Sequence, residues 1–378
     1  MQRLPPLETA PASAALTAAE ALTYPAIQLF VERAAASAGG YELKEEDVPV
    51  IAQICRRLDG IALAIELAAG RLDAFGVRGV ASRLDDRFHL LTHGRRTALP
   101  RHQTLAAAFD WSYNLLSETA RSVMRRLGVF AGRFTMDSAI AVTGDGEIAA
   151  SEVDETVADL VEKSLVVADV GGETVYYRLT DTARAYALKR LTEAGEALAL
   201  ARRHALHQLD QFERAHSDWG TTSTTEWLSI YTPKIDDLRS ALDWAFAPSG
   251  DVAVGIALTV AAVSLWFEMS LMEECRACAE RALTELEERA INDDRRRMLL
   301  SAAVAWSQMY TGGSGRDTGV VWATTAEIAA AIGDTDYRLR ALWGTWATHI
   351  NRENLAQRCQ SPSYFPTLPG RKQIRTID

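Results

Sequence analysis

The chain has 378 residues, of which 48% are apolar and 24% are charged, and its formal net charge is −10. This length and balance allow two or three domains with buried cores, and the acidic charge argues against a protein whose main task is to neutralise phosphate backbone. No run of about 18 apolar residues occurs and residues 1–10 lack the layout of a secretory signal, so we expect a cytoplasmic protein without a membrane span. The cysteines Cys55, Cys275, Cys278 and Cys359 are too few for a disulfide framework, which indicates reduced thiols.

The first 95 residues are predicted to form a linker and a helical domain. Residues 1–23 are rich in proline and alanine without any period, so we interpret them as a linker. From Tyr24 onwards, apolar residues recur at helical spacing, and glycine-containing pairs end the first two runs. The predicted helices of the domain at residues 24–95 cover Ala26–Ala38, Glu45–Leu58 and Ala62–Leu72.

Residues 96–195 combine helices with a single hairpin. Two β-rich runs flank Gly171 and Gly172, which predicts a pair of antiparallel strands. Helices followed by one short hairpin indicate a winged helix. The predicted elements are a helical pair between Asp110 and Arg133 whose second helix starts near Ser117, a helix over Val153–Lys163, strands over Leu165–Asp169 and Thr174–Leu179, and a helix over Thr182–Ala194.

The third part of the chain, residues 196–350, is helical with a loose internal period. Two helices recur per roughly 40 residues, which is typical of a stacked array of helical hairpins similar to tetratricopeptide repeats. The predicted fold class is therefore mainly α, with a helical domain, a winged helix with one short β-hairpin, and tetratricopeptide-like helical repeats. The predicted helices of the array are Val252–Met269, Met272–Glu288, Arg295–Tyr310, Val320–Ile332 and a helix that starts at Asp336 and ends at Ile350.

Residues 351–378 are predicted to be an irregular tail. They contain Pro362, Pro366 and Pro369, and proline cannot sustain a helix. The helix that starts at Asp336 would then lack a packing partner, and its apolar groups would form an uncapped edge of a truncated array. We expect a fragment that self-associates through this edge. The apolar groups of the edge are Leu342, Trp343, Trp346 and Ile350.

Several segments carry a family resemblance. They are Tyr24–Arg33, Leu58–Ala69, Arg96–Leu105, Phe109–Leu116, Leu127–Phe134, Lys163–Val166, Tyr177–Ala187 and Ile235–Trp244. Leu58–Ala69 resembles the signature Gly-Leu-Pro-Leu-Ala-Ile-Glu-Leu-Ala-Ala. Together the segments resemble, in order and spacing, the STAND class (signal-transduction ATPases with numerous domains) found in large bacterial transcriptional regulators. The resemblance covers roughly Pro5 to Leu286.

The resemblance implies a role for each part of the chain. Residues 24–95 would be the helical lid of an ATPase module, residues 96–195 the winged helix that packs on it, and residues 196–350 the start of a sensor array. Gly60 and Ala62 would lie against a bound nucleotide, but Ala62 stands where the family has proline, so the motif is degenerate. The family's ATPase core would lie upstream of Met1, and we expect ATP or ADP to bind only if such a core is supplied.

The sequence contains no phosphate loop. That loop needs lysine directly after glycine, and none of the five lysines follows a glycine. We therefore predict a protein that is not an enzyme and has neither catalytic residues nor a cofactor of its own. Gly144–Ala149 fits the spacing of a dinucleotide-binding loop, but the carboxylates of Asp145 and Glu147 would face the pyrophosphate, so a surface turn between helices is the better interpretation.

Histidine and cysteine pairs do not form a recognisable metal motif. Two histidine pairs share helical faces without an acidic or cysteine partner, and we interpret both as solvated helix faces. Cys275 and Cys278 lie inside a helical pattern and are interpreted as packing residues. The histidine pairs are His89 with His93 and His204 with His207. No metal site is predicted.

The preferred hypothesis is a regulatory protein in signal transduction and transcription regulation that binds a protein or peptide through its repeats. Trp266, Trp306 and Trp343 are candidate contacts, because tryptophan is a frequent anchor of interfaces. Two alternatives stay open, a DNA-binding regulator that uses the winged helix and residual ATP or ADP binding at Gly60. Residues 100–191 hold ten basic and thirteen acidic side chains, a net charge of −3, which disfavours nucleic acid as a partner.

Overall fold

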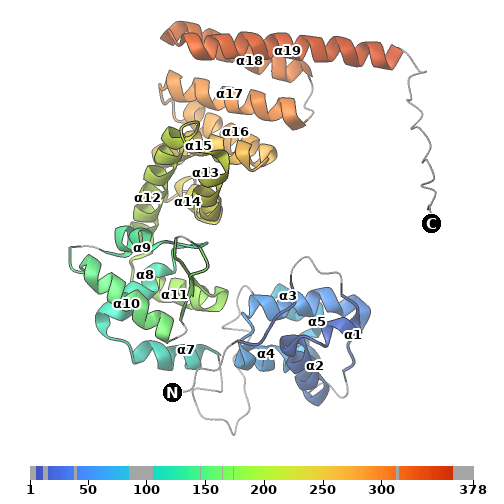
Figure 1. The fold of residues 1–378 in the computed structure, drawn as a ribbon, viewed down its shortest axis with the longest axis vertical. Coiled ribbons are helices and arrows are strands. Elements are labelled where there is room, and N and C mark those ends of the chain that lie inside the picture. Colours follow the sequence, from blue (N-terminus) through green and yellow to red (C-terminus); the bar gives the residue numbers. More distant parts are fainter. Residues whose placement is uncertain are drawn as a thin grey trace, which may run out of the picture. The chain divides into compact units, whose positions relative to one another are not determined.

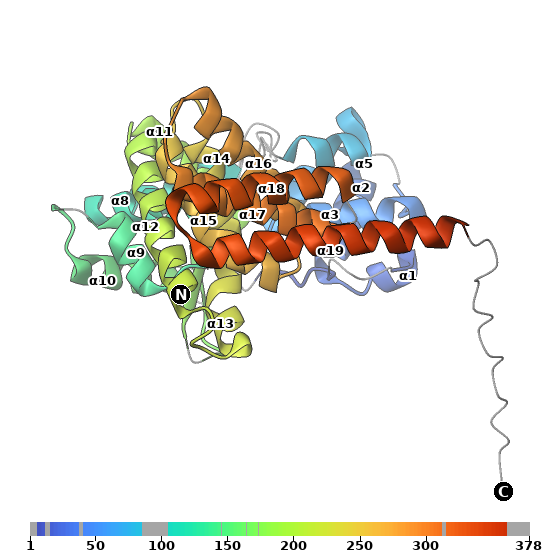
Figure 2. The same cartoon turned by 90° about the horizontal axis from the view of Figure 1, so that it is seen from above.

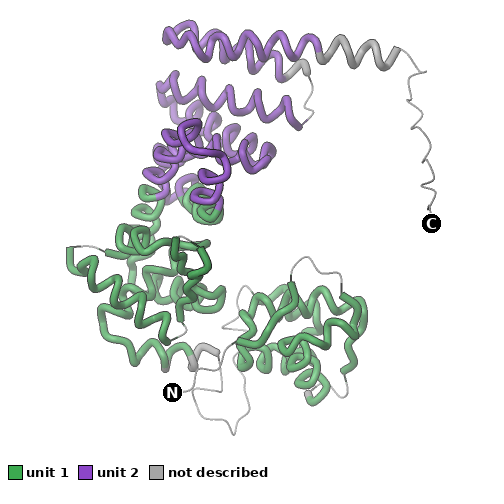
Figure 3. The backbone as a smooth tube through the Cα atoms, viewed as in Figure 1, with its two compact units in different colours: residues 1–207, 233–244 green, residues 208–232, 245–378 purple. Residues whose placement is uncertain are grey.

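The computed structural model describes residues 6–11, 16–37, 41–84, 105–144, 146–163, 165–172, 174–311 and 315–360, without the side chains of residues 37, 105–108, 111, 315–317 and 351–360. The fold is mainly helical with one two-stranded hairpin, as the sequence predicts (Figure 1). The chain divides into two compact units (Figure 3). Unit 1 comprises residues 1–207 and 233–244, and unit 2 comprises residues 208–232 and 245–378. No helix in these described segments is long and apolar enough to cross a bilayer.

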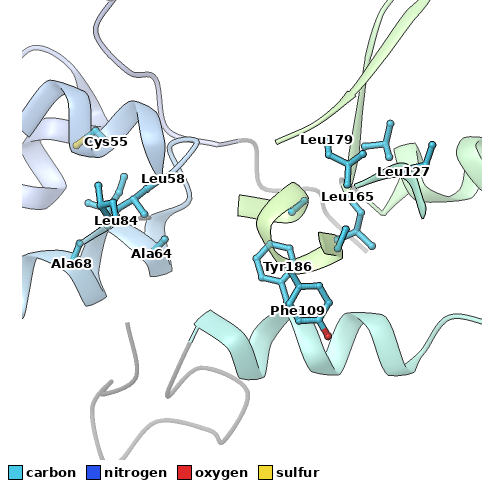
Figure 4. Packing of buried hydrophobic residues seen from close by; sticks show 14 of the residues in the cluster. Cys55, Leu58, Ala64, Ala68, Leu84, Phe109, Leu127, Leu165, Leu179 and Tyr186 are labelled. Carbon is cyan, nitrogen blue, oxygen red and sulfur yellow. The ribbon is translucent and has the colours of Figure 1, made fainter. Parts of the chain in front are cut away.

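Unit 1 begins with a group of helices whose apolar faces meet. Figure 4 shows Cys55, Leu58, Ala64, Ala68 and Leu84 gathered in its core. The sequence predicts one helix over Ala62–Leu72, whereas the chain turns at Gly70 and a further helix, which the sequence analysis does not assign, begins at Leu72. The helices are α1 (Ala18–Ala21), α2 (Pro25–Ser37), the 3₁₀ helix η1 (Glu45–Asp47), α3 (Val48–Arg57), α4 (Ala62–Ala69) and α5 (Leu72–Ser82).

The winged helix forms the next part of unit 1. Ser117, Thr135 and Thr180 each cap a helix by accepting a hydrogen bond from a backbone N–H of its first turn. The predicted hairpin is confirmed, with Val166 opposite Leu179 and Asp169 opposite Tyr176. The elements are α7 (Leu105–Asn114), α8 (Glu118–Leu127), α9 (Met136–Thr143), α10 (Ala150–Glu162), β1 (Val166–Asp169), β2 (Tyr176–Leu179) and α11 (Asp181–Glu193).

Close packing and polar contacts both hold the winged helix together. The ring of Tyr186 stacks on that of Phe109 with centroids 5.2 Å apart (Figure 4), and its hydroxyl donates a 2.6 Å hydrogen bond to Asp110. A Cβ at Gly128 would lie only 2.9 Å from the Cβ of Ala187. Glycine is therefore needed where α8 approaches α11.

The remaining helices follow the winged helix. Trp227 is buried in unit 2, where its indole donates a 2.8 Å hydrogen bond to the carbonyl of Ala215. The helices are α12 (Ala197–Asp218), α13 (Thr224–Tyr231), the 3₁₀ helix η4 (Thr232–Lys234), α14 (Ile235–Ala245), α15 (Val252–Glu268), α16 (Met272–Glu288), α17 (Asp294–Thr311), α18 (Gly315–Ile332) and α19 (Thr335–Gln360).

Helices α15 to α19 of unit 2 pack in sequence, each against the next (Figure 1). Helices α18 and α19 run side by side in both views (Figures 1 and 2). A Cβ at Gly344 would lie 2.3 Å from the indole of Trp322, so this glycine is what allows α19 to lie against that ring. The predicted start of the last helix agrees with the structure to within one residue.

The predicted end of the last helix is wrong. Helix α19 continues to Gln360, ten residues beyond Ile350, so residues 351–360 are helical and not irregular. Neither glycine nor proline occurs between Asn351 and Gln360, and the first proline is Pro362. Nothing in these ten residues therefore opposes continuation of the helix. The predicted tail beyond Gln360 lies outside the described residues.

Candidate functional site

The first candidate surface is the helix that would read DNA. In a helix-turn-helix the second helix enters the major groove, and in this domain that position belongs to α10, which follows α9. Helix α10 carries five carboxylates and no lysine or arginine. Asp159 pairs with Lys163 at the end of the helix. The five acidic residues are Glu152, Asp154, Glu155, Asp159 and Glu162, all at least partly exposed.

The wing does not restore a basic surface. Its tip exposes the apolar Val170, and Arg133, which lies beside the wing, is paired with Asp169 at 2.7 Å. Arg178 of β2 is exposed. The described face made of α10 and the wing therefore carries five carboxylates and an exposed apolar group against one exposed arginine, Arg178, and this excess of acidic groups is opposite to the charge of a phosphate-binding surface.

Comparison with known proteins identifies the class of this domain. Residues 116–192 match the family described as winged helix-turn-helix domain, so the chain contains such a domain. Over 256 residues the chain is 35% identical to proteins of Mycobacterium tuberculosis and Mycobacterium bovis that bear the provisional name HTH-type transcriptional regulator. This match covers 67% of the chain but only 28% of each relative.

A second pair of relatives is shorter. An uncharacterized protein of Mycobacterium tuberculosis is 40% identical over 199 residues, which cover 52% of this chain and 51% of that protein. Its counterpart in Mycobacterium bovis gives the same values. The chain thus spans about a quarter to a half of the length of the curated relatives it matches.

Gly60 and Ala62 are the residues that the family resemblance would place against a bound nucleotide. Gly60 lies in the turn that it forms with Asp59. Gly60 has φ +66°, and its carbonyl accepts a 2.9 Å hydrogen bond from the backbone N–H of Leu7. A Cβ at Gly60 would lie 2.1 Å from the carbonyl oxygen of Leu7, so the N-terminal segment covers this glycine. Ala62, in contrast, is exposed at the start of α4. The two residues therefore do not share one environment.

Asp59 makes a long-range contact that the sequence does not indicate. Its carboxylate accepts hydrogen bonds from the backbone N–H groups of Asp181 at 3.1 Å and Thr182 at 2.9 Å, in the first turn of α11. Burial raises the pKa of Asp59, and the hydrogen bonds from Thr182 oppose this rise. Asp59 thus connects the helical domain to the winged helix, a long-range contact that no local pattern signals.

A buried polar cluster connects the winged helix to α12 and α14 within unit 1. One oxygen of Asp237 lies 3.2 Å from Nε2 of His204 and accepts a 2.7 Å hydrogen bond from the N–H of Ala131. Arg184 donates to the carbonyl of Phe130 at 2.6 Å, and burial lowers the pKa of Arg184. Burial also lowers the pKa of Lys234, and the negative charge of Asp237 opposes this lowering.

This cluster corrects the interpretation of His204 and His207 as a solvated face. His204 is only 2% exposed, because Phe130 packs edge-on against its ring and Asp237 contacts its nitrogen. His207 lies 3.0 Å from the hydroxyl of Ser138. The pair His89 and His93 lies outside the described residues. Among the residues that the structure describes, no group of three or more His, Cys, Asp or Glu side chains could hold a metal ion.

Other predicted features are structural. Ile140–Val142 precedes the Gly144–Ala149 segment and lies in α9, whereas a dinucleotide-binding loop would need a strand there, so the described residues of the segment connect two helices. Cys275 is buried and Cys278 half-buried in α16. Burial raises the pKa of Cys275 to about 11, which suits an inert packing residue.

The last candidate surface is an aromatic face of unit 2. Trp306 and Tyr310 lie one turn apart on α17 and therefore share a helix face. The ring of Trp306 lies 5.4 Å from that of Trp343 on α19, and the ring of Tyr310 lies 6.3 Å from that of Phe267 on α15. Phe267 and Tyr310 also line a shallow pocket with Leu271, Met272 and Thr311.

The three tryptophans proposed from the sequence have different positions. Trp266 is completely buried in α15, so it is a core residue and cannot contact a partner. Trp306 is half-buried and Trp343 is about half exposed. Tyr310, which the sequence did not single out, is 68% exposed. Its spacing of four residues from Trp306 is the signal that could have found it.

Proposed function

We propose that this chain is a non-catalytic regulatory module of a STAND-type transcriptional regulator, acting in the cytoplasm through protein contacts. In this proposal the winged helix is a packing element between the helical domain and the following helices, and the helical array binds a protein or peptide partner. The observation that carries the proposal is the charge of α10, with five carboxylates and no basic residue at the position of a recognition helix.

The charge of α10 opposes binding to DNA. Duplex DNA carries one negative charge per about 1.7 Å of its axis, and proteins gain most of their affinity by neutralising those charges with lysine and arginine. Helix α10 would instead bring five negative charges into the groove. The wing beside it offers Val170 at its tip and an arginine already paired with Asp169. These features favour a domain that packs against protein.

The aromatic face of α15, α17 and α19 supports the partner-binding part of the proposal. Tryptophan and tyrosine are the residues that most often dominate binding energy at protein interfaces. Trp343 and Tyr310 are exposed but each is held against a second aromatic ring, so their side chains are pre-ordered. Pre-ordering reduces the entropy lost when a partner binds.

Nucleotide turnover has no place in this proposal. The sequence lacks a phosphate loop, and the backbone of Leu7 covers Gly60. ATP or ADP would bind only in the presence of a separate ATPase core, and this can be tested by measuring turnover and nucleotide retention of the chain alone.

A DNA-retention experiment tests the proposal against its main rival, a DNA-binding winged helix. The family match to a winged helix-turn-helix domain is the observation that favours the rival. We expect no complex between the full chain and a mixed-sequence duplex at about 10 µM protein and about 50 mM salt. A matched double variant, Asp154→Lys with Glu155→Lys, should bind the duplex weakly and lose it as salt rises. The proposal would be contradicted if the unaltered chain bound the duplex tightly and the two lysines left its affinity unchanged.

Partner capture tests the second part. Tyr310→Ala and Trp343→Ala should each reduce by at least about tenfold the capture of specific proteins from a lysate of the host cell, as expected for interface anchors. Trp219→Ala is the control, because Trp219 is also an exposed tryptophan of unit 2 but lies outside the aromatic face. Equal loss in all three variants would argue against the aromatic face as the binding surface.

A further inference from the structure

The shallow pocket of unit 2 lies where the ends of three helices meet. Phe267 belongs to the last turn of α15 and Tyr310 to the last turn of α17. Glu273 and Glu274 belong to the first turn of α16. All four side chains line the pocket, whose volume is about 750 Å³. This volume is in the range of ligand sites in proteins, so the pocket can accept a side chain of another polypeptide.

The lining of this pocket carries negative charge. It includes two glutamates and, among the described residues, no lysine, arginine or histidine. The last turns of α15 and α17 also contain no basic side chain. A helix C-terminus carries roughly half a negative charge, which basic residues of the last turn often offset. The ends of both helices therefore add to the charge of Glu273 and Glu274.

Neighbouring groups reduce this charge without cancelling it. Arg276 contacts Glu273 at 2.7 Å but also Glu280 at 3.2 Å, so these three side chains together keep one negative charge. Glu268 at the end of α15 accepts a 2.9 Å hydrogen bond from the uncharged indole of Trp219. The N-terminus of α16 carries roughly half a positive charge, which is less than the charge of its two carboxylates. The pocket is thus complementary in charge to a cation.

Two aromatic rings suit the pocket to an organic cation. The rings of Phe267 and Tyr310 lie edge to face with centroids 6.3 Å apart, and Tyr310 is 68% exposed. The face of an aromatic ring attracts an ammonium or guanidinium group. A metal ion would instead need several ligand side chains, and among the residues that the structure describes no group of three or more His, Cys, Asp or Glu could hold one.

We propose that this pocket binds the side chain of a lysine or arginine of the partner polypeptide. The inference rests on the proposed function, to which it adds the chemistry of the partner. The cationic group lies against the aromatic rings and is paired with Glu274. Its alkyl chain contacts Leu271 and Met272, because long basic side chains cover apolar surface while their charge stays near water. A neutral apolar side chain would desolvate Glu274 without pairing it, which costs free energy.

Ligand-observed NMR of the full chain with N-acetylarginine amide tests the cation site. The neutral control probe is N-acetylcitrulline amide, in which a urea group replaces the guanidinium. We expect saturable binding of the arginine probe with a dissociation constant of about 1 to 10 mM, and at least about fivefold weaker binding of the citrulline probe. The affinity should fall as salt rises from about 50 to about 500 mM. Equal binding of both probes, or no binding of the arginine probe at about 20 mM, would overturn the proposal.

Substitutions test whether the probe binds in this pocket. Glu274→Gln should weaken binding of the arginine probe about twofold to fivefold, as expected for a partly exposed ion pair. Tyr310→Leu keeps an apolar side chain but removes the ring, and it should weaken binding by a similar factor of about two to five.

The matched control is Glu287→Gln, because Glu287 is an exposed glutamate in the last turn of α16 and outside the pocket. It should leave the affinity unchanged, and circular dichroism should show the same helix content in all four proteins. If Glu274→Gln and Tyr310→Leu also left the affinity unchanged, the probe would bind elsewhere and the proposal would be wrong.

Failure of this inference can be distinguished from failure of the proposed function. We expect the arginine probe at about 20 mM, but not the citrulline probe, to release captured proteins from the chain. If Tyr310→Ala and Trp343→Ala reduce capture but the arginine probe does not bind, the aromatic face has a partner of other chemistry and only the cation site is wrong. If the arginine probe binds but the chain captures no protein, the polypeptide partner is wrong in both proposals and the pocket takes a free organic cation.

Discussion

Units 1 and 2 are held together by different kinds of contact. In unit 1, single polar side chains connect segments far apart in the sequence, as Asp59 does with α11 and Asp237 does with His204 and Ala131. In unit 2, helices α15 to α19 pack mainly on their neighbours in sequence. Damage to one buried contact should therefore spread through unit 1, whereas in the array of unit 2 it should stay local.

The largest expected effect tests whether buried polar contacts hold unit 1 together. Asp237→Ala would remove the acceptor of the Ala131 N–H and one contact of the buried His204, and a buried polar group that loses its hydrogen-bond partner costs about 1–3 kcal/mol. We expect unit 1 to lose roughly 3 kcal/mol of stability, measured by urea unfolding. The neighbouring exposed Asp236 is the control, and Asp236→Ala should change stability by less than about 0.5 kcal/mol. Equal effects would show that the buried cluster does not hold the unit.

The second prediction tests whether the effect of a substitution stays local in the helical array of unit 2. Gly344→Ala would place a Cβ within 2.3 Å of the Trp322 ring and force α18 and α19 apart, a steric change that costs about 1–3 kcal/mol. Amide hydrogen exchange should accelerate in α18 and α19 but not in α15 and α16. Gly319→Ala on α18 is the control, because its Cβ would lie 3.9 Å from its nearest neighbour and alanine favours a helix. Accelerated exchange throughout unit 2 would contradict local packing.

The smallest effect concerns Asp59 and its pH dependence. Asp59→Ala should cost about 1 kcal/mol through loss of two hydrogen bonds to α11. Burial raises the pKa of Asp59 in the folded protein above its unfolded value, so the folded state binds the proton more tightly. Its contribution to stability is thus fully present below the unfolded pKa and declines as pH rises through the folded pKa.

Asp59→Asn separates the contribution of the hydrogen bonds to α11 from the contribution of the titration of Asp59. It keeps one acceptor for α11 but cannot titrate, so it should lower the stability less than Asp59→Ala and flatten the pH profile of unfolding on the acidic side. Thermal unfolding of the three proteins between about pH 4 and about pH 7 measures this difference. An unchanged profile in Asp59→Asn would mean that another group titrates there.

The sequence by itself determined the class of the fold and part of its elements. Periodic apolar residues, caps such as Ser117 and the glycine turn of the wing are local signals, so the hairpin and the helices α15 to α17 agree with the prediction within a few residues. The end of α19 differs from the prediction, because the ten residues after Ile350 contain neither glycine nor proline and the first proline is Pro362.

Only the tertiary structure decided which residues are available for function. The sequence predicts Trp266 and Trp343 equally as interface residues, yet Trp266 is buried within unit 2 and Trp343 is half exposed. His204 has the pattern of a solvated helix face but meets Asp237 from a helix 33 positions away. Asp59 finds its donors more than 120 residues further on. Burial and long-range pairing depend on which segments the fold brings together, and no local pattern in the chain carries that information.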